Sequence, residues 1–193
     1  MTVYCATGNP GKLREFRLAA VIGGVQVDTA PGLAEIAACE ETGATFEANA
    51  ILKAEYYGRQ APGLLFADDS GLEVDALGGA PGVYSARFAG PGASDDANNQ
   101  LLLERMRGER VRSARFVCVI ALADHGRFVR TFRGAVEGSI LDAPRGPNGF
   151  GYDPLFYYAP FGCSFGEAAP ERKLTVSHRG AALRALFQHL SVC

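Results

Sequence analysis

Long apolar runs are absent from this chain of 193 residues, and so is an excess of charge of either sign. The longest apolar stretch, residues 116–123, has the length of a strand, whereas a membrane-spanning helix needs about 18 or more apolar residues. The 19 basic residues are balanced by 21 acidic ones. Such a balance offers no broad cationic surface for sequence-independent binding to DNA or RNA. We therefore expect neither a membrane protein nor a nucleic-acid-binding protein.

The sequence also lacks paired cysteines. Its five cysteines are scattered and include no C-x-x-C motif that would indicate a zinc or redox centre: Cys5, Cys39, Cys118, Cys163 and Cys193. Residues 1–10 contain no basic segment followed by an apolar one, so we expect no signal peptide. Both observations favour a reduced protein of the cytoplasm.

Lysine is scarce. Only three of the 19 basic residues are lysines, namely Lys12, Lys53 and Lys173, and the other 16 are arginines. Arginine supplies the positive charge wherever a solvated cation is enough, so the positions that keep lysine are candidates for needing a compact ammonium on a flexible stem.

Strand and helix patterns alternate in the first half of the chain, and a hairpin pattern follows in the second half. The expected strands cover residues 2–6, 64–67, 114–123 and 127–136, and the expected helices cover residues 12–20, 45–57 and 94–107 and a last segment from residue 177. A tight turn is expected at residues 68–71. This order predicts an α/β fold with a mixed sheet. No repeat or interdomain linker interrupts it, so residues 1–193 are expected to form a single domain.

The first candidate site is the loop from Thr7 to Lys12, between a predicted strand and a predicted helix. Its residues are Thr7, Gly8, Asn9, Pro10, Gly11 and Lys12. Glycines allow a phosphate to approach the backbone, and a helix N-terminus and a lysine attract its charge. The spacing is not that of a Walker A loop. A glycine- and proline-rich turn before a helix is also common without any ligand, so this loop alone leaves both interpretations open.

Carboxylates form the second candidate. Glu40 and Glu41 are adjacent, and Asp68 and Asp69 directly follow an apolar strand pattern. Two or three carboxylates that converge on one point can hold Mg²⁺ through oxygen, and a further one can accept a proton from water. Solvated surface charge is the simpler interpretation of Glu40 and Glu41, and it is weaker for the aspartates.

Two further segments carry side chains suited to a flat, polar ligand. Residues 148–154 place aromatic rings among glycines, beside Asp153, and Lys173 precedes a Ser-His-Arg-Gly segment at residues 177–180. Exposed rings can stack on a base, and His and Arg can donate to carbonyl oxygens. An aromatic plug over the end of a sheet and an ordinary surface pair are the alternatives.

In combination and order, these segments resemble the inosine triphosphate pyrophosphatase family. The matching stretches are TGNPGK from Thr7, EETGATFEANAILKA from Glu40, ADDSGLEVDALGGAPGVYSARFAG from Ala67, GFGYDPLF from Gly149 and SHRGAAL from Ser177. They span nearly the whole chain. The resemblance implies an elongated mixed β-sheet flanked by helices, in two lobes with a central cleft, and a homodimer.

The resemblance also implies hydrolysis of non-canonical purine nucleoside triphosphates, such as ITP, dITP, XTP and dXTP, to the monophosphate and pyrophosphate. Asp69 would then be the proton acceptor, and Glu41, Asp69 and Asp68 would hold Mg²⁺. The remaining positions resemble substrate-binding residues: Thr7, Gly8, Asn9, Pro10, Gly11, Lys12, Lys53, Ser70, Phe150, Gly151, Tyr152, Asp153, Lys173, His178 and Arg179. The alternatives are a purine nucleotide sensor without catalysis and a pyrophosphatase for other modified nucleotides.

Overall fold

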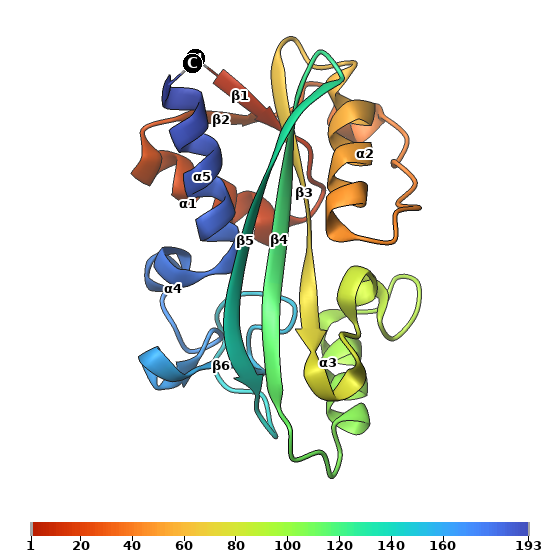
Figure 1. Ribbon diagram of the computed structural model, residues 1–193, viewed down its shortest axis with the longest axis vertical. Coiled ribbons are helices and arrows are strands. Elements are labelled where there is room, and N and C mark those ends of the chain that lie inside the picture. The colour runs from red at the N-terminus through yellow and green to blue at the C-terminus, as the bar shows by residue number, and fades with distance from the viewer. Residues whose placement is uncertain (1, 193) are drawn as a thin grey trace. The chain divides into compact units, whose positions relative to one another are not determined.

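The computed structural model describes residues 2–192, and its framework is one seven-stranded sheet in the order β2-β1-β3-β4-β5-β6-β7 (Figure 1). The strands are β1 (Thr2–Cys5), β2 (Gln26–Thr29), β3 (Leu64–Val74), β4 (Ser113–Asp124), β5 (Arg127–Ile140), β6 (Phe156–Tyr158) and β7 (Cys163–Ser164). The helices are α1 (Pro10–Gly23), α2 (Phe46–Gly58), α3 (Asp95–Arg105), α4 (Pro170–Val176) and α5 (His178–Val192). β1 runs parallel to β2 and β3, whereas β6 is antiparallel to β5 and β7. The prediction of a mixed sheet flanked by helices is confirmed.

The chain forms two compact units. Unit 1 contains the chain up to Asp69, Cys118–Gly134 and the chain from His178, and unit 2 contains Ser70–Val117 and Ala135–Ser177. Strands β3, β4 and β5 contribute residues to both units. Neither unit is therefore a continuous segment of sequence.

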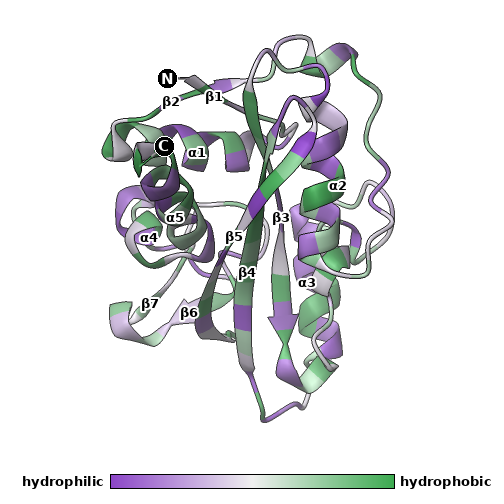
Figure 2. Cartoon of the chain, turned by 45° about the horizontal axis from the view of Figure 1, so that its top comes forward, coloured by the Kyte–Doolittle hydropathy of each residue, from purple (hydrophilic) through white to green (hydrophobic). Residues whose placement is uncertain are grey.

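In unit 1, α1 and α5 lie side by side on one side of the strands, and α2 lies on the other side (Figures 1 and 2). Asn9 caps α1 by accepting a hydrogen bond from the backbone N–H of Lys12, and Thr45 caps α2 in the same way from Ala48. The Phe16 ring packs edge-on against Phe66, with 5.1 Å between centroids. Hydrophobic residues fill the middle of β4 (Figure 2), where the strand is buried.

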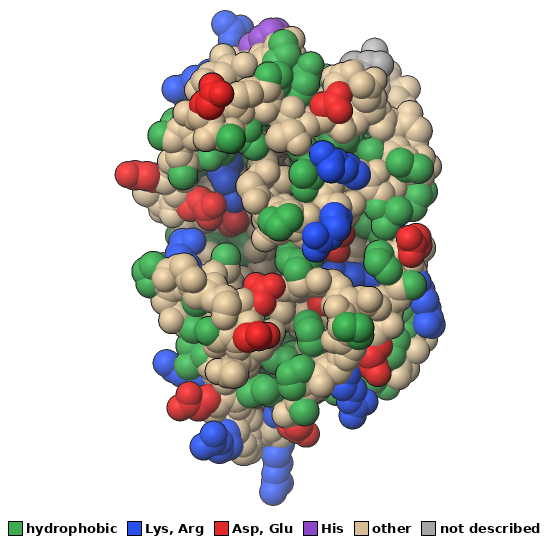
Figure 3. Space-filling view, turned by 180° about the vertical axis from the view of Figure 1, so that it is seen from behind, with side chains coloured by type: hydrophobic (Ala, Val, Ile, Leu, Met, Phe, Trp, Pro, Cys, Tyr) green, Lys and Arg blue, Asp and Glu red, His purple; other side chains and the backbone are tan. Residues whose placement is uncertain are grey.

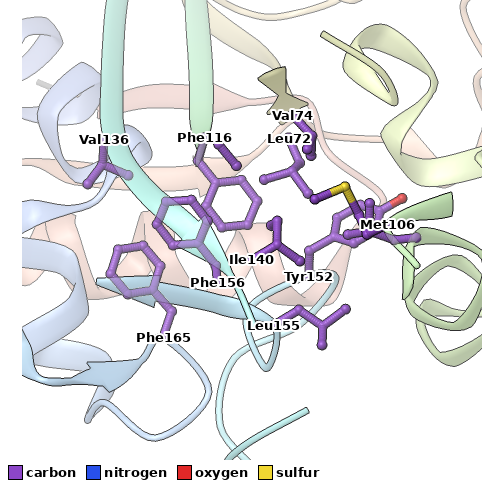
Figure 4. Packing of buried hydrophobic residues seen from close by; sticks show 12 residues of the cluster. Leu72, Val74, Met106, Phe116, Val136, Ile140, Tyr152, Leu155, Phe156 and Phe165 are labelled. Atoms are coloured by element: carbon purple, nitrogen blue, oxygen red, sulfur yellow. The ribbon is translucent and has the colours of Figure 1, made fainter. Parts of the chain in front are cut away.

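In unit 2, one apolar cluster joins the sheet to α3 and to the loop before β6 (Figure 4). Its buried members are Leu72, Val74, Leu102, Met106, Ala114, Phe116, Val136, Ile140, Tyr152, Leu155, Phe156 and Phe165. The Phe116 and Phe156 rings are 4.5 Å apart. Burying this many large side chains stabilises the unit by hydrophobic transfer and close packing.

The predicted hairpin between β4 and β5 is confirmed. Its two turn residues, His125 and Gly126, have φ angles of 47° and 76°. Positive φ at both central positions is the geometry of a type I′ turn, whose twist matches that of the flanking strands. Gly126 adopts a positive φ without steric cost, whereas His125 adopts it although it has a Cβ atom.

The tight turn predicted at residues 68–71 is wrong, because β3 continues to Val74. Leu72 and Val74 are fully buried, so the apolar pattern continues beyond the aspartates and keeps this segment in the sheet. Successive side chains of a strand point to opposite faces. Asp68 and Asp69 therefore lie on opposite faces of the sheet, which a turn would not have required.

The sequence patterns also missed the short strands β2, β6 and β7 and the short helix α4. None of the helices within residues 2–192 is both long enough and apolar enough to cross a membrane. Side chains of both charge signs are interspersed on the face seen in Figure 3. Four cysteines, Cys5, Cys39, Cys118 and Cys163, are free thiols, and Cys193 lies outside the described residues.

Candidate active site

Asp68 is bound by two cations on the side of β3 that faces α1 and α5. The carboxylate is only 2 % exposed. The Nζ atom of Lys12, in the first turn of α1, lies 3.0 Å from its oxygens, and Nε of Arg179, in α5, lies 3.5 Å from Oδ2. Burial by itself would raise the pKa of Asp68, but these cations and Lys53 outweigh it and hold the pKa well below its usual range. These cations therefore favour the ionised form of Asp68.

Arg179 is also paired with Glu15, whose Oε2 accepts a hydrogen bond of 2.5 Å from Nη1. Burial would lower the pKa of Arg179, but Glu15 and Asp68 more than compensate and raise it. Lys12 and Arg179 thus balance Asp68 and Glu15, two charges of each sign. A buried ionic group of this kind tolerates the loss of one member poorly, because the others lose their compensation.

Asp69 has different neighbours, on the side of β3 that faces α2. Lys53 Nζ lies 2.9 Å from its Oδ1, and Asn49 Nδ2 donates to its Oδ2 over 3.2 Å. Asn49 and Lys53 are four residues apart, so they share one face of α2. Burial raises the pKa of Asp69, and Lys53, its main opposing charge, does not cancel the effect. Asp69 is therefore the carboxylate better suited to accept a proton.

Glu41 belongs to the Asp69 side, because its Oε1 lies 3.2 Å from Lys53 Nζ. Two carboxylates thus meet at one ammonium, and their oxygens are the donors that a hard divalent cation such as Mg²⁺ prefers. Within residues 2–192, no three His, Cys, Asp or Glu side chains gather closely enough to hold a metal ion. Of the expected set of Glu41, Asp69 and Asp68, Asp68 contacts Lys12 and Arg179 on the other face of β3, and the set itself stays a prediction.

The loop before α1 is exposed at residues 8–10, and Lys12 extends from it toward Asp68. Thr7 Oγ1 accepts a hydrogen bond from the backbone N–H of Asn9, which itself caps the helix. The loop thus presents backbone at the positive end of α1. His178, the first residue of α5, is buried, and Ser70 follows Asp69 in β3 as the first residue of unit 2.

A second cluster of predicted residues lies in unit 2. Lys173 and Asp153 are both almost completely buried, and Lys173 Nζ lies 2.5 Å from Asp153 Oδ2. The same oxygen accepts the backbone N–H of Phe150 over 2.9 Å. The ring centroids of Phe150 and Phe165 are 5.3 and 5.6 Å from Nζ, within the range of cation–π attraction. This Lys173 cluster (Phe150, Asp153, Phe165 and Lys173) combines a charge, a carboxylate and aromatic faces.

The loop that contains Phe150 is fixed by α3. Asp95 Oδ2 accepts the backbone N–H of Gly151 over 2.6 Å, and Asn99 Nδ2 donates to the carbonyl of the same glycine over 2.9 Å. Tyr152 is a core residue whose hydroxyl donates to the carbonyl of Ser85. The aromatic-plug interpretation thus describes Tyr152, whereas Phe150 is only half-buried.

Several residues that hold these groups were not predicted from the sequence: Glu15, Asp95 and Asn99, together with the role of Asn49. One signal was available for Glu15, which follows Lys12 by three residues and so shares its side of the helix. The shared face of Asn49 and Lys53 was visible in the spacing, but the partners of Asn49 were not. The contacts of Asp95 and Asn99 with Gly151 depend on the tertiary fold.

Comparison with known proteins identifies close relatives along almost the entire chain. The model of the Ham1 family matches residues 3–189. A protein of Acidobacterium capsulatum named dITP/XTP pyrophosphatase is 51 % identical over 199 residues, which cover 98 % of each chain. A Thermus thermophilus protein of the same name is 51 % identical over 97 % of this chain and 91 % of its own.

Solved structures of similar proteins share the fold. A HAM1 protein from Coxiella burnetii has a TM-score of 0.88 at 37 % identity, with both chains covered completely. The Staphylococcus aureus Ham1 protein has a TM-score of 0.86 at 40 % identity, over 99 % of this chain and 98 % of its own. These matches bear out the resemblance found in the sequence motifs.

Proposed function

This chain belongs to the Ham1 family, and we propose that it hydrolyses non-canonical purine nucleoside triphosphates, ITP, dITP, XTP and dXTP, to the monophosphate and pyrophosphate. The names of relatives that are half identical along their whole length support this substrate class. The observation that carries the proposal is the setting of Asp69. It is a buried carboxylate with a raised pKa that shares Lys53 with a second carboxylate, Glu41.

Cleavage between the α and β phosphates requires a water molecule aligned with the α phosphorus and a neutralised leaving group. In our proposal Asp69 accepts the proton of that water. Glu41 and Asp69 would hold Mg²⁺, which would supply positive charge to the phosphate oxygens. No covalent nucleophile is needed.

The phosphates are assigned to the loop from Thr7 to Lys12 and to Lys53. The loop offers exposed backbone at a helix N-terminus, which attracts anions. Both ammonium groups lie beside acidic partners, which hold them in position for an anionic phosphate. Asp68 is assigned the role of holding Lys12 and Arg179 in place.

The base is assigned to the Lys173 cluster, and His178 and Ser70 stay predicted substrate contacts. Hypoxanthine and xanthine carry an oxygen at ring position six, to which an ammonium can donate. Adenine carries an amino group there and would leave a buried donor unpaired, at a cost of roughly 1–3 kcal/mol. Arg179 was expected in this group, but its contacts with Glu15 and Asp68 favour a role in anchoring Asp68.

We further propose that the enzyme works as a homodimer in the reducing cytoplasm. The free thiols Cys5 and Cys118 are buried, which is compatible with that compartment. Sedimentation equilibrium tests the assembly: a mass of about twice 20.4 kDa is expected. A single-chain mass across the concentration range would contradict it.

The decisive experiment measures magnesium-dependent release of pyrophosphate from ITP, XTP, ATP, GTP, CTP and UTP in parallel. We expect turnover of ITP and XTP and weak or no turnover of the other four. Guanine shares the oxygen at position six, so the exclusion of GTP must depend on its additional 2-amino group. Binding of ITP without cleavage would instead support a sensor, and preferential cleavage of CTP or UTP would support a pyrophosphatase for other nucleotides. Chelation of the divalent cation with EDTA should abolish the release, and an excess of Mg²⁺ should restore it.

A further inference from the structure

Asn49 connects the loop that contains Glu41 to Asp69. Its side chain is fully buried near the start of α2. Oδ1 accepts the backbone N–H of Gly43 over 2.7 Å, and Nδ2 donates to Asp69 Oδ2 over 3.2 Å. One neutral side chain therefore touches both the chain segment of Glu41 and the carboxylate proposed as proton acceptor.

The orientation of this amide is determined by its partners. A backbone N–H can only donate, so the atom that faces Gly43 must be the oxygen, and the NH₂ group must then face Asp69. The two oxygens of Asp69 consequently have separate donors, Lys53 at Oδ1 and Asn49 at Oδ2. Together these bonds fix the rotation of the carboxylate about its Cβ–Cγ bond.

Gly43 is a glycine because the loop approaches α2 closely. A Cβ atom at this position would lie 2.6 Å from Asn49 Oδ1 and 2.8 Å from the Cβ of Ala48. Real Cβ atoms do not approach other atoms so closely, so any larger residue would push the loop away from the helix. The hydrogen bond between Gly43 and Asn49 thus depends on the absence of a side chain at position 43.

We propose that Asn49 is a positioning residue for the reaction: it orients the Asp69 carboxylate and holds the Glu41 loop at a fixed distance from it. Lys53 contacts the same two carboxylates, but it is a mobile charge assigned to phosphate. Asn49 is neutral and has both partners inside the protein, so it keeps the geometry when Lys53 moves. This inference rests on the proposed role of Asp69 and adds to it the residue that aims the proton acceptor.

The test compares Asn49→Leu with a matched control, Asn98→Leu. Asn98 in unit 2 is also a buried amide that accepts a backbone N–H, from Ala89 over 2.8 Å, and donates onward, to the carbonyl of Ala86. Both variants remove one acceptor and one donor from a buried site, so both should lower the urea midpoint of unfolding. Only Asn49→Leu should lower the kcat for ITP, by about 10- to 100-fold with KM within about threefold.

A third variant, Asn49→Asp, separates the two bonds. It keeps an oxygen for the N–H of Gly43 but places a second carboxyl group against Asp69, which either repels the Asp69 carboxylate or shares a proton with it. It should remain as slow as Asn49→Leu, since a restored loop bond does not restore the orientation of Asp69. If Asn49→Leu does not fold, the turnover of Asn49→Asp tests by itself whether Asn49 orients Asp69.

A readout without nucleotide accompanies the kinetics: calorimetric titration of each variant with Mn²⁺ alone. Asn49→Leu should bind Mn²⁺ about tenfold or more weakly than wild type, and Asn98→Leu should match wild type. Turnover of Asn49→Leu equal to that of Asn98→Leu, or wild-type turnover of Asn49→Asp, overturns the proposal. If the wild type releases no pyrophosphate, the proposed function fails, and the Mn²⁺ titration alone then decides: unchanged affinity in Asn49→Leu overturns the role of Asn49, and weakened affinity supports it.

Discussion

Two neighbouring aspartates lie on opposite faces of β3, and their pKa values are shifted in opposite directions. Asp68 contacts Lys12 and Arg179, and its pKa lies well below the usual range. Asp69 contacts Lys53 and Asn49, and its pKa is raised. Both are buried, so burial alone does not explain the difference.

The number of cations on each side explains it. Asp68 has two cationic partners, whereas Asp69 has one lysine, which it shares with Glu41, and a neutral amide. Burial penalises both anions, and only on the Asp68 side does the surrounding charge overcome that penalty. Asp68 and Asp69 are adjacent in β3, yet Asp68 binds cations whereas Asp69 is the candidate base.

The largest expected difference between the two faces is in turnover. Asp69→Asn keeps the shape of the side chain but cannot accept a proton, so kcat for ITP should fall by about 10²- to 10⁴-fold. Asp68→Asn should reduce it far less. Pyrophosphate release at saturating Mg²⁺, with ITP affinity measured by calorimetry, makes the comparison. A greater loss in Asp68→Asn would transfer the role of base to Asp68.

Folding stability should fall more in Asp68→Asn than in Asp69→Asn, the reverse of the order expected for turnover. Asp68→Asn removes the carboxylate that Lys12 and the buried Arg179 share, and breaking a buried ionic group costs about 3–5 kcal/mol. Asp69→Asn leaves Lys53 still paired with Glu41, so its cost should be smaller. Urea unfolding of both variants measures the free energies. Equal losses would show that the two carboxylates are equivalent as structural anions.

The pH dependence of stability should differ in sign between the aspartates. The pKa of Asp68 is lowered, so its stabilising contribution is present above the ordinary carboxyl pKa and is lost as the pH falls toward its folded value. The pKa of Asp69 is raised, so its contribution is present below the ordinary pKa and is lost as the pH rises through its folded value. Relative to wild type, Asp68→Asn should lose less stability on acidification, and Asp69→Asn should lose less as the pH rises. Parallel shifts in the two variants would contradict this assignment.

The smallest expected difference is in the alkylation rates of the cysteine thiols on the Asp68 side and the Asp69 side of β3. On the Asp68 side, burial and the nearby carboxylate raise the pKa of Cys118 far above its usual range, and burial raises the pKa of Cys5 to about 11. Cys39, whose N–H donates to Tyr57 of α2, is partly exposed, and its pKa is raised as well, chiefly by burial. Iodoacetamide at pH 8 should label Cys39 slowly and the two buried thiols only after unfolding. Mass spectrometry of peptides measures this, and early labelling of Cys118 would show that the Asp68 side opens readily.

The sequence predicted the longer elements because they depend on local signals, and local signals also supplied the site residues that stay predictions. Apolar periodicity revealed β4, β5 and α2, and the scarcity of lysine pointed to Lys12, Lys53 and Lys173, each of which now has an acidic partner. Short strands such as β2 contain too few residues for a period to stand out, and tertiary pairing decides them.

The misplaced turn at residues 68–71 had a physical cause. Asp, Ser and Gly favour turns locally, but the sheet continues through them because Leu72 and Val74 are buried beyond. For the same reason the sequence could not separate the roles of Asp68 and Asp69. Their partners come from helices far apart in the chain, and no local pattern indicates on which face of a strand each helix will lie.

The ion pair between Arg179 and Glu15 joins residues that are 164 positions apart. Before it forms, the chain must lose the conformational entropy of that long loop, whereas Lys12 and Asp68 are separated by only 56 positions. Contacts between such distant residues slow folding, because the entropy of closing the loop is lost before the contact stabilises the chain. During refolding, helical circular dichroism should therefore recover before enzymatic activity does.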